Sequence, residues 1–168
     1  MLKELRNRYF DMAEEGDPEA IRSIVITVED VATAYEARQR SPRRPVLRVT
    51  PPFSGRMRAR LHDPGPSSFS EGSDTDLDPE TGAVHVPPGR LLAEDAIPPY
   101  PSPDDTEDAL REDPDAEFTV DAHRERHVAA VEEWREAVRD GIAASAELRL
   151  SGGPRSVDVK TLGGSSGG

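Results

Sequence analysis

The 168-residue chain is long enough for one domain, yet only 35% of its residues are hydrophobic and its formal net charge is −12. It contains no cysteine, which excludes disulfides, thiolate catalysis and cysteine-ligated metal. No stretch approaches the roughly 18 apolar residues of a membrane-spanning helix, and the charged amino terminus lacks an apolar signal region, so we expect a cytoplasmic protein without membrane partners.

The first quarter of the chain is predicted to be mainly helical. Residues 2–15 carry apolar side chains at helical spacing, and Asp17-Pro18 opens a short new turn. Residues 21–26 form an apolar patch that is either a strand or the tail of that turn. Thr27 is well placed to cap a helix over residues 28–40.

A β-hairpin is predicted over residues 45–62, with Pro and Gly in its connection. Its second strand alternates, so one face should carry Arg56, Arg58, Arg60 and His62, and the other Met57, Ala59 and Leu61. A third strand is expected at residues 83–86, followed by a helical turn at residues 88–94.

Two acidic segments are predicted to be flexible. Residues 64–82 combine several acids with Ser, Gly and Pro, and residues 101–117 are acidic, with a possible short helix at residues 107–111. Residues 97–103 are rich in proline and should be extended. The tail at residues 163–168 has a Gly/Ser linker composition, which leaves residues 1–162 as a single domain.

The longest helical pattern covers residues 119–145 and contains the only tryptophan, Trp134. Thr119 can cap its start. An apolar stripe at helical spacing predicts that the helix lies on the core, with Trp134 buried against the sheet near Met57, Leu61 or a residue of the C-terminal hairpin. The stripe consists of Val120, Val131, Trp134, Val138 and Ile142.

Two alternating segments near the carboxyl terminus, at residues 146–150 and 156–162, predict a second hairpin. The predicted fold class is therefore α+β: a small, mostly antiparallel sheet, built from two hairpins and a short strand, packed under the long helix and shorter N-terminal helices. Strand order and oligomeric state cannot be read from this pattern.

The arginines are concentrated in one window. Residues 37–62 contain eight arginines and no acid, although the chain as a whole is strongly acidic. Because the guanidinium fork matches phosphate and carboxylate, the window predicts an anion-binding surface with DNA or RNA as the leading ligand. Phe53 at the hairpin tip could stack on a base. Alternatively, the arginines pair with the acidic loops. The candidate residues are Arg43, Arg44, Arg48, Phe53, Arg56, Arg58 and Arg60.

The four histidines form a second candidate site. His123 and His127 lie one helical turn apart, as in metal-binding helices, and His62 and His85 on predicted strands could complete a zinc site. Glu125 lies between the helical pair but faces away from it, so no general base is supplied as in zinc proteases. The alternative is that these histidines are hydrogen-bonded within the core.

The surface composition is typical of proteins from salt-loving organisms. Of the 21 basic residues only Lys3 and Lys160 are lysine, and acids are abundant. The stretches VTPPFSGRMRARLH, HVPPGRLL and HRERHVAAVEEWREAV resemble small uncharacterised proteins of haloarchaea, a domain of unknown function. The resemblance covers roughly residues 28–162, and it implies an archaeal, halophilic host and a single domain but no activity.

The sequence favours a binding protein over an enzyme, since it has no P-loop, no GxGxxG, no GxSxG elbow and no kinase signature. The leading prediction is a protein that binds nucleic acid through the arginine hairpin. A second hypothesis is an interaction module that contacts another protein through residues 97–103 and the hairpin edge. A third is a histidine-based metal-binding protein.

Overall fold

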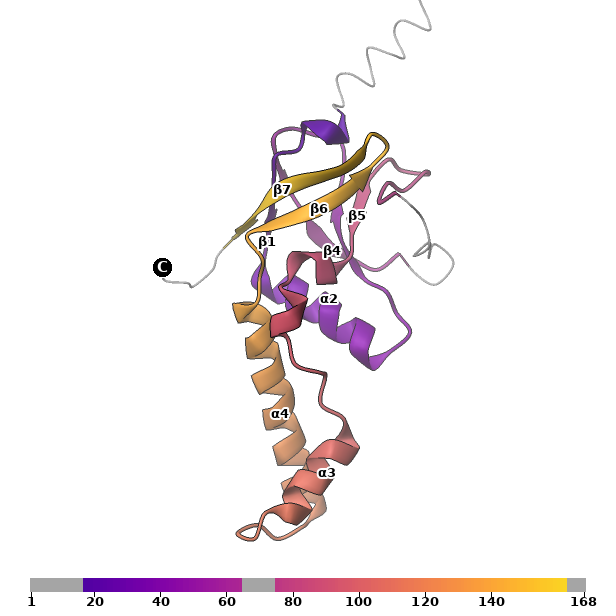
Figure 1. The fold of residues 1–168 in the computed structure, drawn as a ribbon. Helices are drawn as coiled ribbons and strands as arrows, with labels where there is room; N and C mark the ends of the chain where they lie inside the picture. Colours follow the sequence, from indigo (N-terminus) through magenta and orange to yellow (C-terminus); the bar gives the residue numbers. More distant parts are fainter. Residues whose placement is uncertain (1–16, 65–74, 163–168) are drawn as a thin grey trace, which may run out of the picture.

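The computed structural model describes residues 17–64 and 75–162 (Figure 1), so the predicted helix at residues 2–15 and the tail at residues 163–168 lie outside the described residues. The predicted α+β class is confirmed. The described part combines a mixed four-stranded sheet, an antiparallel three-stranded sheet and three α-helices.

The four-stranded sheet is built around β1 (Ser23–Ile26), which settles the apolar patch at residues 21–26 as a strand. Its order is β3-β1-β7-β6, where β3 spans Arg56–Arg58, β6 spans Ser145–Leu150 and β7 spans Gly153–Thr161. β6 and β7 form the predicted C-terminal hairpin. However, β1 runs parallel to both β3 and β7. The sequence predicted a mostly antiparallel sheet and did not include these two parallel pairings.

The three-stranded sheet is fully antiparallel and has the order β4-β2-β5. β2 (Val46–Val49) pairs with β4 (Arg60–His62) as the predicted hairpin, and β5 (Val84–Val86) is the predicted third strand. The predicted hairpin pairing is therefore confirmed for residues 60–62 only, since residues 56–58 pair with β1.

The predicted second strand of that hairpin breaks at Ala59. The Ala59 N–H donates to the Val25 carbonyl over 2.9 Å, so the residues before it stay in the four-stranded sheet, while Arg60 begins the pairing with β2. Ala59 is buried, and its small side chain fits this crossing point. One continuous segment thus connects both sheets.

A second connection joins the opposite edges of the sheets. The Asp76 N–H donates to the Arg149 carbonyl of β6 over 2.7 Å, and the His85 N–H of β5 donates to the Asp76 carbonyl over 2.8 Å. The sheets therefore meet along both edges, as in a small barrel. Composition predicted flexibility for residues 64–82; residues 75–77 instead lie between two strands, and Asp76 is 8% exposed.

Helix α2 (Val28–Arg40) matches its predicted bounds, and the Thr27 hydroxyl accepts the Asp30 N–H over 3.2 Å as its cap. The helix crosses below the strands in Figure 1 and packs on β2 and β4. Short 3-10 turns lie at η1 (Pro18–Ala20), η3 (Pro88–Leu91) and η4 (Glu94–Ala96), and η3 contacts α2. None of the helices within residues 17–64 and 75–162 is long and apolar enough to cross a membrane.

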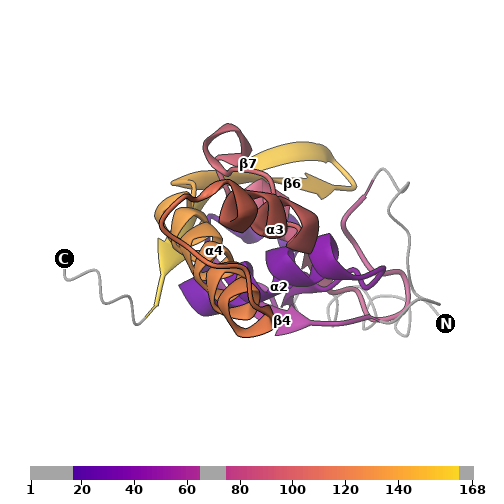
Figure 2. The ribbon, with the colours of Figure 1, turned by 90° about the horizontal axis from the view of Figure 1, so that it is seen from below.

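Helices α3 (Pro103–Glu112) and α4 (Val120–Asp140) pack on each other and project away from the strands (Figure 1), and in the view from below all three α-helices lie in front of the strands (Figure 2). The Ser102 hydroxyl caps α3 by accepting the Asp105 N–H over 3.1 Å. The sequence predicted a flexible segment over residues 101–117 with a short helix at residues 107–111; the helix begins earlier, at Pro103, and buries Thr106 and Leu110.

Only the C-terminal half of α4 lies on the core. Trp134 and Val138 are buried, whereas Val120 is 70% exposed, so the predicted apolar stripe is wrong at its first residue. The reason is that the N-terminal half of α4 leaves the strands and contacts α3 instead. A helical period alone does not tell how far the core extends along a helix.

Trp134 is 2% exposed, which confirms its predicted burial. The residues that contact the indole belong to a helix and a loop, whereas the prediction placed the indole against the sheet. It stacks on Tyr35 of α2 with ring centroids 5.6 Å apart, meets Tyr100 edge-on at 4.8 Å, and donates its Nε1–H to the Pro98 carbonyl over 3.0 Å. The proline-rich segment is thus held against α4.

Candidate anion-binding groove

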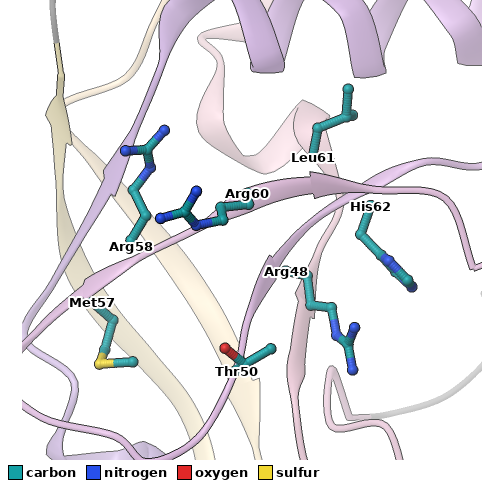
Figure 3. A pocket seen from close by; sticks show the side chains of 7 residues that line it. All are labelled: Arg48, Thr50, Met57, Arg58, Arg60, Leu61 and His62. Atoms are coloured by element: carbon teal, nitrogen blue, oxygen red, sulfur yellow. The ribbon is translucent and has the colours of Figure 1, made fainter.

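An open groove of about 400 Å³ lies beside β2 and the consecutive strands β3 and β4 (Figure 3). Arg58 and Arg60 lie on one side of it, and Arg48 and His62 on the other. We call this feature the groove; its lining residues are Arg48, Thr50, Met57, Arg58, Arg60, Leu61 and His62.

Strand register and the break at Ala59 bring these residues together. Arg48 of β2 lies directly opposite Arg60 of β4, and directly opposed residues of an antiparallel pair share a face. Arg58 belongs to β3, in the other sheet, and reaches the groove because the chain turns at Ala59. The three arginines therefore come from three strands, whereas the sequence predicted a row of arginines along a single strand.

The charged residues that line the groove are all basic, and the Asp78 carboxylate lies outside the lining but within electrostatic reach of Arg48 and His85. None of the lining residues is acidic, and within the described part of the chain Arg48, Arg58 and Arg60 form no ion pair. The predicted pairing of the arginines with acidic loops therefore does not extend to these three among the described residues. Guanidinium groups in this arrangement can donate to a bound anion.

Unpaired buried nitrogens gather at the same place. Among the described residues, the buried side-chain nitrogen and oxygen atoms that lack a hydrogen-bond partner are Nε of Arg48, Nε of Arg58 and Nε2 of His85. His85 lies directly opposite Arg48 across the β2–β5 pair, and its ring is 5.4 Å from that of His62. Buried polar atoms are usually satisfied in folded proteins, so these three nitrogens without a partner are an unusual feature of the strands beside the groove.

His85 is kept neutral by its surroundings. Burial lowers the pKa of its imidazole, the nearby His62 and Arg48 act in the same direction, and the carboxylates of Asp78 and Asp76 oppose them. A neutral ring keeps one protonated nitrogen as a donor and one lone pair as an acceptor. His85 can therefore hold a fixed orientation beside the cations without adding to their mutual repulsion.

The remaining predicted arginines are placed differently. Arg43 forms an ion pair with Asp63, and Arg44 donates to the Ser41 and Arg43 carbonyls, so both take part in the turn before β2. Arg56 is exposed on β3 but is not part of the groove lining. The structure thus gathers Arg48, Arg58 and Arg60 and leaves the other three outside the groove.

Phe53 does not lie where the sequence placed it. It is 9% exposed and belongs to the hydrophobic core, so the predicted stacking on a nucleic-acid base is wrong for this conformation. Burying its aromatic ring in the core stabilises the fold more than leaving the ring exposed at the hairpin tip. Leu61, expected on the buried face, is instead 39% exposed and lines the groove, because β4 lies at the edge of its sheet.

The four histidines separate into two pairs and do not converge. His62 and His85 lie beside the groove, whereas His123 and His127 lie between α3 and α4. Within residues 17–64 and 75–162, no group of three or more His, Cys, Asp or Glu side chains is arranged to hold a metal ion.

The helical pair has a structural role. The His123 Nε2–H donates to the Pro103 carbonyl over 2.9 Å, and the Thr106 hydroxyl donates to the same carbonyl over 2.9 Å. Nδ1 of His127 contacts the Thr106 oxygen at 3.2 Å. The Nε2 nitrogen of His123 is therefore protonated, and both rings pack against the start of α3 through Thr106.

Two groove features were missed from the sequence. Thr50, whose hydroxyl can donate to an anion, was treated only as the end of a strand, and His62 was considered only as a metal ligand. The alternation of Arg60 and His62, together with the pairing of β2 and β4, was the available signal for His62. No comparable signal existed for Thr50.

The comparisons with known proteins give a family but no activity. A family described as a domain of unknown function (DUF8009) matches residues 11–163. No curated protein and no solved structure matches the chain. The family description names neither a function nor a lineage, so the haloarchaeal host stays a prediction.

Proposed function

Since the chain belongs to the DUF8009 family, whose description names no activity, we propose from the groove geometry that it is a non-enzymatic binding protein for an anionic partner, most directly nucleic acid. One observation carries the proposal. Three arginines, a histidine and a threonine hydroxyl line one groove that contains no carboxylate. Acidic residues outnumber basic residues 33 to 21 in this chain, so a lining whose charged residues are all basic is a specific local feature.

Arginine suits this role at any salt concentration. A guanidinium group makes paired hydrogen bonds to phosphate oxygens, and these depend on geometry more than on long-range attraction. Counterion release weakens as salt rises, so a protein working in concentrated salt must rely on such short contacts. The groove meets this requirement because its arginines extend from paired strands.

The alternative of a protein partner on the proline-rich segment has less support. Two of its groups are already used within the molecule, since the Pro98 carbonyl accepts from Trp134 and the Tyr100 hydroxyl donates to Glu36 over 2.8 Å. Those contacts hold the segment against α2 and α4. The groove, in contrast, presents unpaired donors.

The test is a fluorescence-anisotropy titration of labelled single- and double-stranded oligonucleotides in dilute and in molar KCl. We expect the wild type to bind and a variant with Arg48→Ala, Arg58→Ala and Arg60→Ala to lose binding. Arg56→Ala is the matched control, because it removes the same side chain from the same strand segment but outside the groove lining. Absence of wild-type binding to any oligonucleotide, or unchanged binding by the folded triple variant, would refute the proposal.

A further inference from the structure

We propose that single-stranded nucleic acid crosses the outer surface of the strands along a band of cations that runs from the groove over β1 to Lys160 of β7. The inference rests on the proposed function and specifies the form of the nucleic acid and its path. We call this feature the cation band; its members are Arg48, Arg58, Arg60 and Lys160.

Within the groove the cations are spread out. Arg48 of β2 lies directly opposite Arg60 of β4, so these two side chains share a face of the three-stranded sheet. Figure 3 shows the head group of Arg48 pointing away from those of Arg58 and Arg60. Proteins that follow a single strand place their cations along a track in this way, so that successive phosphates are met by different side chains.

The four-stranded sheet continues the band beyond the groove. Arg58 of β3 and Lys160 of β7 are both register partners of Val25 in β1, one on each side of it. Ile24 and Ile26 belong to the hydrophobic core, and successive side chains of a strand alternate, so Val25 and its two partners lie on the outer face. Lys160 is exposed and forms no ion pair with any residue that the structure describes. The band thus gains a fourth cation.

Acidic residues mark where the band ends. In the next row of the four-stranded sheet, Ser23 pairs with Arg56 on one side and with Asp158 on the other, so that row carries one cation and one anion. The row of Val25 carries two cations and no acid. Beyond β2, the Asp78 carboxylate lies within electrostatic reach of the band. The excess positive charge is therefore confined to one path across the strands.

The shape of this path favours a single strand over a duplex. From β2 to β7 the band takes three steps between neighbouring strands, each of about 4.8 Å, so it spans about 14 Å across two sheets that close on each other. A duplex is stiff over roughly 150 base pairs and does not follow so short a curved path, whereas a single strand does. Met57 and Leu61 add apolar surface in the groove, which unstacked bases can contact.

The experiment measures how salt affects binding, by fluorescence anisotropy with a labelled oligonucleotide of about 12 nucleotides that is either single-stranded or annealed to its complement. Each phosphate contact of a single strand contributes about −0.7 to the slope of log affinity against log salt. Lys160→Ala should therefore make the slope shallower by about 0.7. This corresponds to a roughly eightfold loss of affinity at about 0.05 M KCl that disappears near 1 M. The single strand should bind more tightly than the duplex.

Two further variants serve as controls. Arg56→Ala removes a cation from the same face, but from the row that also contains Asp158, and should keep the wild-type slope. Lys160→Arg should keep it as well, because the charge remains. Lys160 is exposed, so its replacement should leave the fold intact.

The outcomes separate this inference from the proposed function. An unchanged slope in Lys160→Ala, an equal change in Arg56→Ala, or tighter binding of the duplex would overturn the inference. The proposed function would still stand if the variant with Arg48→Ala, Arg58→Ala and Arg60→Ala lost binding. Absence of wild-type binding to either form of the oligonucleotide would overturn both.

Discussion

Trp134 shows how one residue fixes the position of three separate segments. Its ring touches Tyr35 of α2 and Tyr100 of the proline-rich segment, while its N–H bonds the Pro98 carbonyl. Beside it, Glu36 accepts from Tyr100 and forms an ion pair with Arg135. The buried carboxylate is thus paired, as a charge in such a position must be.

Replacing Trp134 with Ala is expected to destabilise the protein by about 3–5 kcal/mol, because the loss of the ring leaves a cavity between two tyrosines. Chemical denaturation measures this. Val128→Ala on the same helix is the control, since Val128 is exposed and its loss should change stability by no more than about 0.5 kcal/mol. Similar effects of the two substitutions would contradict the assigned role of Trp134.

The Tyr100 phenol should lose its proton at a higher pH than an ordinary tyrosine. Burial and the hydrogen bond to the Glu36 carboxylate raise the pKa of its phenol to about 12 from 10.0. Because the folded state holds this proton more tightly than the unfolded state, Tyr100 stabilises the fold below pH 10, and the contribution is lost as the pH rises towards 12. Ultraviolet absorbance titration of the wild type and of Tyr100→Phe checks this.

The variant should lack the latest phenolate step. Tyr35→Phe is the useful comparison, because burial and Glu94 also raise the pKa of Tyr35. If Tyr100→Phe retained every late step of the wild type, the hydrogen bond to Glu36 would not exist in solution.

At the scale of elements, the α3–α4 pair depends on a small polar cluster. The buried Thr106 hydroxyl contacts the Pro103 carbonyl and the rings of His123 and His127. Few large apolar side chains support this projecting pair, and Leu110 is the buried one on α3. The polar contacts therefore carry an unusual share of its packing.

Thr106→Val keeps the shape of the side chain but removes its hydroxyl. It should destabilise the protein by about 1–3 kcal/mol, since His127 is left without its partner. Thr33→Val is the matched control, because Thr33 is exposed on α2 and the same change there should have little effect. Limited proteolysis should cut the Thr106→Val variant first near α3. Equal stability of the two variants would show that the cluster is not required.

At the scale of the whole molecule, closure of the two sheets rests on Asp76. Its backbone links β5 and β6, and its carboxylate accepts the Arg149 N–H over 2.7 Å and pairs with Arg90. The buried Asp76 carboxylate therefore serves a strand N–H and an arginine at the same time.

Asp76→Ala should cost about 3–5 kcal/mol, since it leaves the Arg90 charge unpaired in a partly buried site. Glu147→Ala is the control: its contact with Arg149 spans 3.8 Å between half-exposed side chains, and its loss should cost at most about 1 kcal/mol. Thermal and urea unfolding of the two variants give the comparison. A stable Asp76→Ala protein would mean that other contacts hold the sheets together.

The sequence alone predicted the elements that local rules control. The caps at Thr27 and Thr119, the strand at residues 83–86, the C-terminal hairpin and the burial of Trp134 all follow from capping chemistry or hydrophobic period, which act over a few residues. The arginine window was equally visible, and Arg48, Arg58 and Arg60 were among its candidates.

Only the tertiary structure decided which of these residues meet. The parallel pairing of β1 with β3 and β7, the break at Ala59 and the insertion of Asp76 between β5 and β6 are long-range contacts without a local signature. They turned an expected one-strand ladder into a groove lined from three strands, placed Phe53 in the core and separated the histidines into two pairs. The physical reason is that the choice of strand partners depends on how much apolar surface the whole core buries. A local sequence period carries no information about that total.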